Sequence, residues 1–259
     1  MLAAERQNRI REILLEYMHV DVSSLCTLLR VSPATVRRDL DSLEKEGFLL
    51  KTYGGAVLSE SKDGGRVQLR DIDNPFESER KSIAAYAATL VEDDDTVFLG
   101  GDDTCLMLAR QLALKKRLSV VTNSIGAAMA LMESPGISKL LIGGVLSGDP
   151  ANPEACGEAA RAQVSNMFFN KCFFSLDGVS LQRGYTVNNL EKCSLLRTVL
   201  ANSTQSYALV DSSSAQKTSL HPLGKPDLFA NVVAPMSIPA EFQEFWLNNG
   251  IRLYEVTPN

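Results

Sequence analysis

The first 58 residues show three short helical patterns followed by two short strand patterns. Apolar residues recur at the spacing of one helix face in two stretches, Ile10, Ile13, Leu14 and Tyr17 and then Val22, Leu25, Cys26 and Leu29. Asp21, a common N-cap residue, precedes the second stretch. Ser32-Pro33 predicts the start of a third helix and Gly47 predicts its end. Two strands and the turn between them are predicted at Phe48–Thr52, Ala56–Leu58 and Tyr53-Gly54-Gly55.

The second and third predicted helices, joined by a turn of about three residues, have the form of a helix-turn-helix. Val36, Leu40 and Leu43 mark the buried face of the third helix, so Ala34 and Arg38 point outward. A slim N-terminal end followed by arginine suits entry into the major groove of DNA. The candidate DNA-contacting residues are Ser32, Ala34, Thr35, Arg37, Arg38, Lys51 and Tyr53. The alternative is an ordinary three-helix bundle with a solvated basic face.

The polar segment Ser59–Pro75, which contains Gly64-Gly65, predicts a linker, so the domains are expected at 1–58 and 76–259. Beyond it, strand-like apolar runs recur at Thr96–Leu99, Leu118–Val121, Lys139–Ile142, Lys171–Leu176, Tyr207–Val210, Phe229–Val233 and Arg252–Val256. Helical stretches alternate with most of them, at Glu77–Val91, Thr104–Leu114, Ser124–Met132, Glu158–Met167, Leu190–Asn202 and Ala240–Asn249. This alternation predicts a mostly parallel sheet covered by helices on both faces.

In sheets of this kind, small ligands bind beyond the carboxyl ends of the strands. The loops that follow the predicted strands are therefore the candidate ligand-binding loops. They are Gly100-Gly101-Asp102-Asp103, Thr122-Asn123-Ser124, Gly143-Gly144, Asp177-Gly178 and Asp211-Ser212-Ser213.

Composition and charge narrow the classes of function. The chain has 259 residues and a net charge of −5, and residues 1–60 hold eight basic and nine acidic residues, so a DNA contact must come from a local patch. Five scattered cysteines and only two histidines disfavour a disulfide framework and a structural zinc site, and no metal or cofactor is expected. No apolar run approaches the ~20 residues of a membrane span, and the polar N-terminus lacks a signal core. We therefore expect a cytoplasmic protein that does not engage a membrane.

One motif runs through the N-terminal part of the chain: Val31-Ser32-Pro33-Ala34-Thr35-Val36-Arg37-Arg38-Asp39-Leu40, then Leu43-Glu44, Gly47 and Tyr53-Gly54-Gly55-Ala56. With this motif, residues 1–58 resemble the N-terminal DNA-binding domain of the DeoR family of bacterial transcription regulators. The remainder is similar to the sensor domain of that family, which is related to sugar-phosphate isomerases. The similar segments are Val121-Thr122-Asn123-Ser124, Gly143-Gly144, Asp177-Gly178, Gly184-Tyr185-Thr186, Asn189-Leu190-Glu191 and Asp211-Ser212-Ser213.

The resemblance implies an α/β protein with a small winged helix-turn-helix domain and a larger, Rossmann-like sensor domain. It also implies a repressor of carbohydrate-utilisation genes that binds double-stranded operator DNA as a homo-oligomer, a dimer or a tetramer. The effector is expected to be a small sugar, sugar acid, polyol or sugar phosphate. The candidate effector-binding residues are Gly100, Gly101, Asp102, Asp103, Thr104, Thr122, Asn123, Ser124, Gly143, Gly144, Asp177, Gly178, Thr186, Glu191, Arg197 and Lys217.

The sequence departs from the family pattern in the first sensor loop. The family loop usually reads Asp-x-Gly-Thr-Thr, whereas this chain has Gly100-Gly101-Asp102-Asp103-Thr104-Cys105. The family also tends to carry lysine where this chain has Leu196 and Ser214, although Arg197 and Lys217 lie nearby. Two carboxylates beside an anion repel it, so we expect weak or no binding of simple sugar phosphates. Either Asp103 caps the following helix and Asp102 is solvated, or the carboxylates bind a polyol, a sugar or an aminated compound.

An enzyme of the related fold, an isomerase or deaminase with an added N-terminal domain, is the main alternative function. Glu191, Asp177 and Asp211 could supply carboxylates, but Leu196 stands where a cation is needed. A protein–protein adaptor is a third possibility. The run from Glu92 to Asp95 is expected to be a solvated turn, and Cys105 is not expected to act as a nucleophile.

Overall fold

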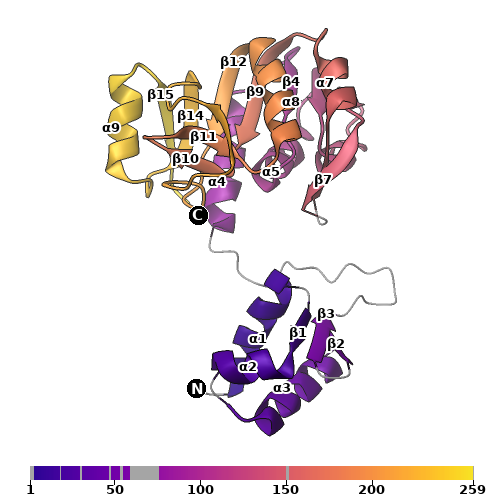
Figure 1. The fold of residues 1–259 in the computed structure, drawn as a ribbon. Helices are drawn as coiled ribbons and strands as arrows, with labels where there is room; N and C mark the ends of the chain where they lie inside the picture. Colours follow the sequence, from indigo (N-terminus) through magenta and orange to yellow (C-terminus); the bar gives the residue numbers. More distant parts are fainter. Residues whose placement is uncertain are drawn as a thin grey trace. The chain divides into compact units, whose positions relative to one another are not determined.

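The computed structural model describes residues 3–17, 19–29, 31–46, 48–52, 55–58, 76–149 and 152–258 (Figure 1). The chain separates into two compact units, Met1–Asp73 and Asn74–Asn259, which we call the N-terminal unit and the C-terminal unit. The predicted linker at 59–75 lies outside the described residues. None of the described helices is long and apolar enough to span a membrane.

The N-terminal unit contains three helices and a small antiparallel sheet. Its elements are α1 (Ala3–Tyr17), β1 (His19–Asp21), α2 (Val22–Leu29), α3 (Pro33–Lys45), β2 (Leu49–Thr52) and β3 (Gly55–Leu58). The strands have the order β1-β3-β2. The three predicted helices and the predicted hairpin are confirmed, whereas β1 was not predicted, because three residues are too few to show an alternating pattern.

The apolar stripes of the three helices meet in one core. Ile10 and Leu14 of α1, Leu25 of α2, and Val36 and Leu43 of α3 are fully buried in it. Ser32 caps α3 as predicted, since its Oγ accepts a hydrogen bond from the backbone N of Thr35 at 3.3 Å. The helix ends at Lys45 with Glu46 as its C-cap residue, and Gly47 lies outside the described residues.

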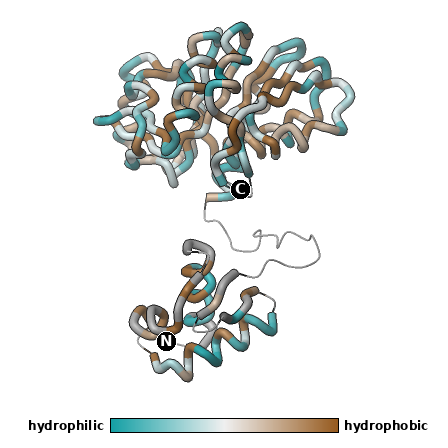
Figure 2. Tube along the Cα trace, turned by 45° about the vertical axis from the view of Figure 1, so that its right-hand side comes forward, coloured by the Kyte–Doolittle hydropathy of each residue, from teal (hydrophilic) through white to brown (hydrophobic). Residues whose placement is uncertain are grey.

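The C-terminal unit is built on a seven-stranded sheet whose neighbouring strands are all parallel. The strands are β4 (Thr96–Leu99), β5 (Leu118–Thr122), β6 (Ile137–Leu141), β9 (Phe169–Ser175), β12 (Ser203–Leu209), β14 (Asn231–Pro235) and β15 (Arg252–Val256), in the order β15-β14-β12-β9-β4-β5-β6. Each corresponds to one of the seven predicted runs, so the predicted α/β fold class is confirmed. Figure 2 shows hydrophobic stretches of chain within this unit and hydrophilic residues at many of its outer turns.

Helices cover both faces of this sheet, as predicted. The helices α4 (Glu77–Thr89), α5 (Asp103–Leu112) and α6 (Ile125–Ala130) pack against one face through an apolar cluster that includes Ile83 and Leu108. The helices α7 (Glu158–Val164), α8 (Leu190–Ala201) and α9 (Ala240–Asn248) pack against the other, through a cluster that includes Leu196 and Trp246. The two clusters make the sheet the buried middle layer of the unit.

Two smaller groups of strands lie outside the main sheet and were not predicted. One is the antiparallel hairpin of β7 (Val145–Asp149) and β8 (Asn152–Cys156). The other is the antiparallel sheet of β10 (Gly178–Ser180), β11 (Gly184–Val187) and β13 (His221–Gly224). These strands are short and rich in polar residues, glycine and proline, so they lack the apolar runs that predict strands.

The prediction of a solvated turn at Glu92–Asp95 is wrong for its last residue. Asp93 and Asp94 are exposed and pair with Arg117. Asp95 is buried instead, because one of its carboxylate oxygens lies 2.7 Å from Lys171 Nζ and 2.8 Å from the backbone N of Glu92. The acidic run therefore joins a surface turn to a buried ion pair.

Candidate functional site

One face of α3 is exposed along the side opposite its buried stripe. Ala34, Arg37 and Arg38 are exposed, and Thr35 is half-buried. Val36 and Leu40 lie on the buried side, so the predicted orientation of the helix is confirmed. We call Ala34, Thr35, Arg37 and Arg38 the outer strip of α3.

The two arginines of the outer strip make no ion pair with the described part of the chain. The other cation predicted for this surface, Lys51, pairs with Asp41 and lies 3.9 Å from Glu44. Tyr53, which was also predicted here, lies outside the described residues. The positive charge that this face can offer to a partner therefore comes from Arg37 and Arg38, and from the exposed Lys45 at the end of α3.

A buried ion pair sets the position of α3 against α1. Asp39 is 4% exposed, and its two carboxylate oxygens accept hydrogen bonds from Arg6 of α1 at 2.5 and 3.0 Å. Bidentate pairing of this kind has a defined geometry. The outer strip is thus presented on a helix that both the apolar core and this pair hold in place.

The C-terminal unit has a pocket of about 430 Å³ at the carboxyl ends of its central strands. The chain runs from β4 outward through β5 to β6, and from β9 in the opposite direction through β12 to β15, so β4 and β9 form the topological switch point. The pocket lies at that point. Its lining consists of Arg80, Gly101, Asp102, Asp103, Thr104, Gly148, Asp149, Glu154, Ser175, Leu176, Asp177, Asn188, Asn189, Lys192, Asp211, Ser213, Ser214 and Lys217.

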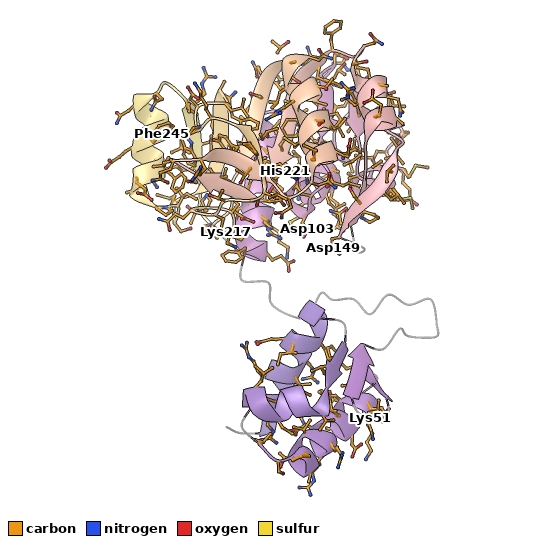
Figure 3. All side chains as sticks on the ribbon, viewed as in Figure 1. Lys51, Asp103, Asp149, Lys217, His221 and Phe245 are labelled. Carbon is orange, nitrogen blue, oxygen red and sulfur yellow. The ribbon has the colours of Figure 1, made fainter. Side chains whose placement is uncertain are left out.

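Asp102, not Asp103, caps α5. Asp102 Oδ1 accepts a hydrogen bond from the backbone N of Cys105 at 2.9 Å, and its Oδ2 accepts one from the backbone N of Ser175 at 3.1 Å. The alternative in which Asp103 is the cap and Asp102 is solvated is therefore wrong. Asp103 is the first residue of α5, and its carboxylate lies at the pocket (Figure 3).

Arg80, in the first turns of α4, reaches into the pocket. Its guanidinium lies 2.5 Å from Asp211 and 3.3 Å from Asp103, and it donates a hydrogen bond to Ser213 Oγ at 3.2 Å. Glu79 beside it accepts hydrogen bonds from the backbone N and the Oγ of Ser212, both at 2.8 Å. The start of α4 is thus fastened to the loop after β12, a contact that nothing in the sequence pattern indicates.

Another buried ion pair lies at the pocket. Lys192 of α8 and Glu154 of β8 are both less than 10% exposed, with Nζ and Oε1 separated by 3.0 Å. Burial by itself lowers the pKa of the Lys192 amine. The carboxylates of Glu154, Asp102 and Asp177 outweigh burial and raise that pKa above its ordinary value, so the amine stays protonated.

Lys192 corrects the expectation that the family's pocket lysine is missing from α8. The expected lysine position, Leu196, is buried in the core, but Lys192 one turn earlier points to the pocket. Gly101 lets Glu154 approach, because a Cβ at Gly101 would lie 2.2 Å from a Glu154 carboxylate oxygen. Glu154 lies on β8 of the hairpin that was not predicted. The sequence analysis therefore identified neither Glu154 nor its partner Lys192.

The structure brings together six of the predicted effector-binding residues in the pocket lining, namely Gly101, Asp102, Asp103, Thr104, Asp177 and Lys217. Ser214, at the second expected lysine position, is also part of the lining. Figure 3 shows Asp103, Asp149 and Lys217 on the lower side of the C-terminal unit.

The other predicted residues lie outside the lining. Thr122, Asn123 and Ser124 are buried at the end of β5 and just after it, where Asn123 Nδ2 donates hydrogen bonds to Glu154 Oε2 and to the carbonyl of Ala155, both at 3.1 Å. They support the β7–β8 hairpin and so position Glu154. Cys105 is buried at the start of α5, and burial raises the pKa of its thiol well above the ordinary value, which disfavours a nucleophilic thiolate.

The remaining predicted residues make structural contacts elsewhere in the unit. Gly143 bonds to the side chain of Gln163, and Gly144 lies against the backbone of Cys156. The Thr186 hydroxyl donates a hydrogen bond to the Gly178 carbonyl at 3.1 Å. Gly100, Glu191 and Arg197 each donate a hydrogen bond within the unit. Gly100 N donates to Phe173 O, Glu191 N to Asn189 Oδ1, and Arg197 Nε to Leu223 O.

Comparison with known protein families gives two matches that lie one in each unit. Residues 6–62 match the DeoR-like helix-turn-helix domain, and residues 76–234 match the DeoR C-terminal sensor domain. The fold and the two sites thus define a helix-turn-helix regulator with a ligand-sensing domain. This chain belongs to the DeoR family of transcription regulators.

Curated relatives align with this chain over most of their length. The chain is 33% identical to the HTH-type transcriptional regulator GolR of Listeria innocua over 82% of each chain. It is 30% identical to the lactose phosphotransferase system repressor of Lactococcus lactis, over 80% of this chain and 82% of the relative. A ribose 5-phosphate isomerase A of Methanocaldococcus jannaschii superposes over 52% of this chain and 53% of that one. The TM-score is 0.38 and the sequence identity is 18%, so the two structures are only loosely alike.

Proposed function

We propose that this protein is a transcriptional repressor of a carbohydrate-utilisation operon, acting in the cytoplasm as a homo-oligomer, a dimer or a tetramer, on double-stranded operator DNA. Residues 1–58 would form the DNA-binding domain, 59–75 the linker and 76–259 the effector-binding domain. The family of the chain and the names of its relatives, a lactose phosphotransferase system repressor among them, support this proposal. A dimer would place two recognition helices on half-sites that are one turn of DNA apart.

The observation that carries the proposal is the outer strip of α3. Its N-terminal residues are small, which allows close approach to base edges, and its arginines are exposed without an internal acidic partner in the described residues. Arginine binds guanine edges and phosphates through two donors at once. Because the N-terminal part of the chain is not basic overall, binding should depend on this strip, with weak non-specific affinity that falls steeply with salt.

The C-terminal pocket would hold the effector. It lies at the switch point of a parallel sheet, where ligands of such sheets bind, and its volume suits a molecule of sugar size. We propose no catalytic role for it. Sugar isomerisation needs a cation that can stabilise an enediolate, and two of the pocket cations, Arg80 and Lys192, are already paired with carboxylates.

Effector control would act through the start of α4. This helix is the first element of the C-terminal unit and follows the segment that leads from the DNA-binding domain. Arg80 and Glu79 fasten it to the loop after β12, and Arg80 also lines the pocket. A ligand that competes for Asp103 or Ser213 would change those contacts and thereby shift the helix, which supplies a physical coupling between the two sites.

The test of the DNA-binding role uses a duplex selected from a random pool on the full-length protein. We predict that Arg38→Ala lowers affinity for that duplex by about 1–3 kcal/mol, because one base or phosphate contact is lost. Arg161→Ala, which removes an exposed arginine of α7, is the matched control and should leave affinity unchanged. Fluorescence anisotropy titration measures both. Failure to select any sequence, or equal affinity of Arg38→Ala and the wild type, would contradict the proposal.

A further inference from the structure

The pocket carries more carboxylates than cations. Its lining contains Asp102, Asp103, Asp149, Glu154, Asp177 and Asp211, against Arg80, Lys192 and Lys217. Two of the cations are already paired within the lining, Arg80 with Asp211 and Asp103, and Lys192 with Glu154. A phosphate would add negative charge to a lining that already has an excess of it, and like charges a few ångströms apart repel.

At the pocket, a carboxylate of the protein already occupies one backbone N–H group of the first turn of α5 and one at the end of β9. Proteins hold phosphates with N–H groups at helix N-termini and in tight turns. Here the Asp102 carboxylate accepts from Cys105 N at 2.9 Å through one oxygen and from Ser175 N at 3.1 Å through the other. The protein's own carboxylate therefore lies in the position that an anionic ligand would need.

Two further turns at the pocket are filled in the same way. In the loop after β12, Asp211 Oδ1 accepts from the backbone N–H groups two and three residues later, at 3.0 and 3.1 Å. At the start of α8, Asn189 Oδ1 accepts from the N–H groups two and three residues later, at 2.8 and 3.0 Å. In these three turns, a side-chain oxygen of the protein therefore accepts from backbone N–H groups that a bound anion could otherwise use.

From these contacts we infer that the effector is an unphosphorylated, hydroxyl-rich molecule with a protonated amine, as amino sugars and amino polyols are. The inference rests on the proposed function, since it takes this pocket as the effector site. Carboxylates only accept hydrogen bonds, so the ligand must supply the donors. Hydroxyl groups do so, and an ammonium group in addition offsets the excess negative charge of the lining.

Asp103 is the carboxylate best placed to receive the amine. Its side chain is 51% exposed, and its contact with Arg80 is 3.3 Å long, whereas the contact of Arg80 with Asp211 is 2.5 Å. An ammonium group could replace Arg80 at Asp103 while Arg80 keeps its pairing with Asp211. The same replacement would release one of the contacts that hold the start of α4.

Isothermal titration calorimetry of the full-length chain tests the ligand class. The probes are glucosamine, galactosamine, mannosamine and their amino alcohols, each compared with the parent hexose or hexitol and with its own 6-phosphate. We expect at least one amine to bind at least ~10-fold more tightly than both of its counterparts. A 6-phosphate or a neutral parent that binds as tightly as its amine overturns the inference, and so does the absence of measurable binding by every amine.

Asp103→Asn separates the amine contact from general damage to the pocket. The variant keeps the size of the side chain and removes its charge, so the affinity of the amine should fall ~10-fold while the thermal unfolding midpoint stays that of the wild type. Asp93→Asn, in the exposed turn before β4, is the control and should change neither quantity. Unchanged amine affinity in Asp103→Asn overturns the role of Asp103. Selection of a DNA duplex without binding of any amine contradicts this inference alone, whereas failure to select a duplex contradicts the proposed function.

Discussion

Lys171 places a charged amine in the interior of the C-terminal unit, on the central strand β9. It is 6% exposed, and its Nζ lies 2.7 Å from Asp95 Oδ2. Removing one partner of a buried ion pair leaves the other charge without compensation. We predict that Lys171→Ala lowers the free energy of unfolding by about 3–5 kcal/mol. Urea unfolding followed by the fluorescence of Trp246, the single tryptophan of the chain and fully buried in this unit, measures the loss.

Two further variants serve as controls for the Lys171→Ala prediction. Lys81→Ala removes an exposed lysine whose partner is Glu77 on the same helix, and it should cost no more than ~0.5 kcal/mol. The double variant Lys171→Met with Asp95→Asn removes both charges and should recover most of the stability, because no charge is left unpaired. If Lys171→Ala is as stable as Lys81→Ala, the buried ion pair between Lys171 and Asp95 does not stabilise the unit as we predict.

At the residue scale, the sequence predicted types of chemistry better than individual partners. It indicated an acidic loop after β4, yet a shift of one residue in the start of α5 gave the cap to Asp102 and left Asp103 at the pocket. It missed Arg80 and Lys192, because their partners lie 131 and 38 residues away along the chain and no local pattern connects them. Long-range pairs of this kind depend on topology, which local periodicity does not contain.

At the element scale, the strands β4, β5, β9 and β14 of the main sheet were predictable because they are buried on both faces over most of their length. Val97, Phe98 and Leu99 of β4 are all fully buried, so the strand appears in the sequence as a continuous apolar run. The β7–β8 hairpin lacks this signal, since Val145 and Leu146 are exposed and β8 contains Pro153. Yet this hairpin delivers Glu154 to the pocket, so the least predictable element contributes to the site.

The contacts of Glu79 at the start of α4 lead to a prediction about effector control. Glu79 holds the helix to Ser212 and to Ser237, whose Oγ lies 3.0 Å from Glu79 Oε1, but Glu79 is not part of the pocket lining. We predict that Glu79→Ala binds the effector with the affinity of the wild type. In the wild type, the effector should change DNA affinity within the range of ordinary allosteric coupling, about 5–150-fold, and in Glu79→Ala this change should be smaller. Calorimetry gives the first quantity and anisotropy with the selected duplex gives the second.

The control for Glu79→Ala is Lys81→Ala on the same helix, which leaves the contacts to the loop after β12 intact. It should behave as the wild type in both measurements. If Glu79→Ala responds to the effector as strongly as Lys81→Ala, then α4 does not carry the coupling and the control of DNA binding takes another path.

At the scale of the whole molecule, the chain divides into two compact units, and each contains a match to one domain of the DeoR family. The division was predictable from the change in pattern on either side of a polar segment, and the family resemblance covers both parts. The net charge of −5 gave no sign of DNA binding, because the arginines that we propose for DNA contact form a short strip on one helix. What the sequence lacked was the arrangement of the pocket, which depends on six segments that meet only in the folded unit.

The most direct test of effector-controlled DNA binding is one anisotropy titration. The full-length chain is titrated into its selected duplex with and without the amine that calorimetry shows to bind, at a concentration of about 100 times its dissociation constant. We predict that the saturating amine changes the dissociation constant for the duplex at least ~5-fold, which corresponds to a coupling free energy of about 1 kcal/mol. Equal affinity for the duplex with the pocket empty and saturated would contradict it.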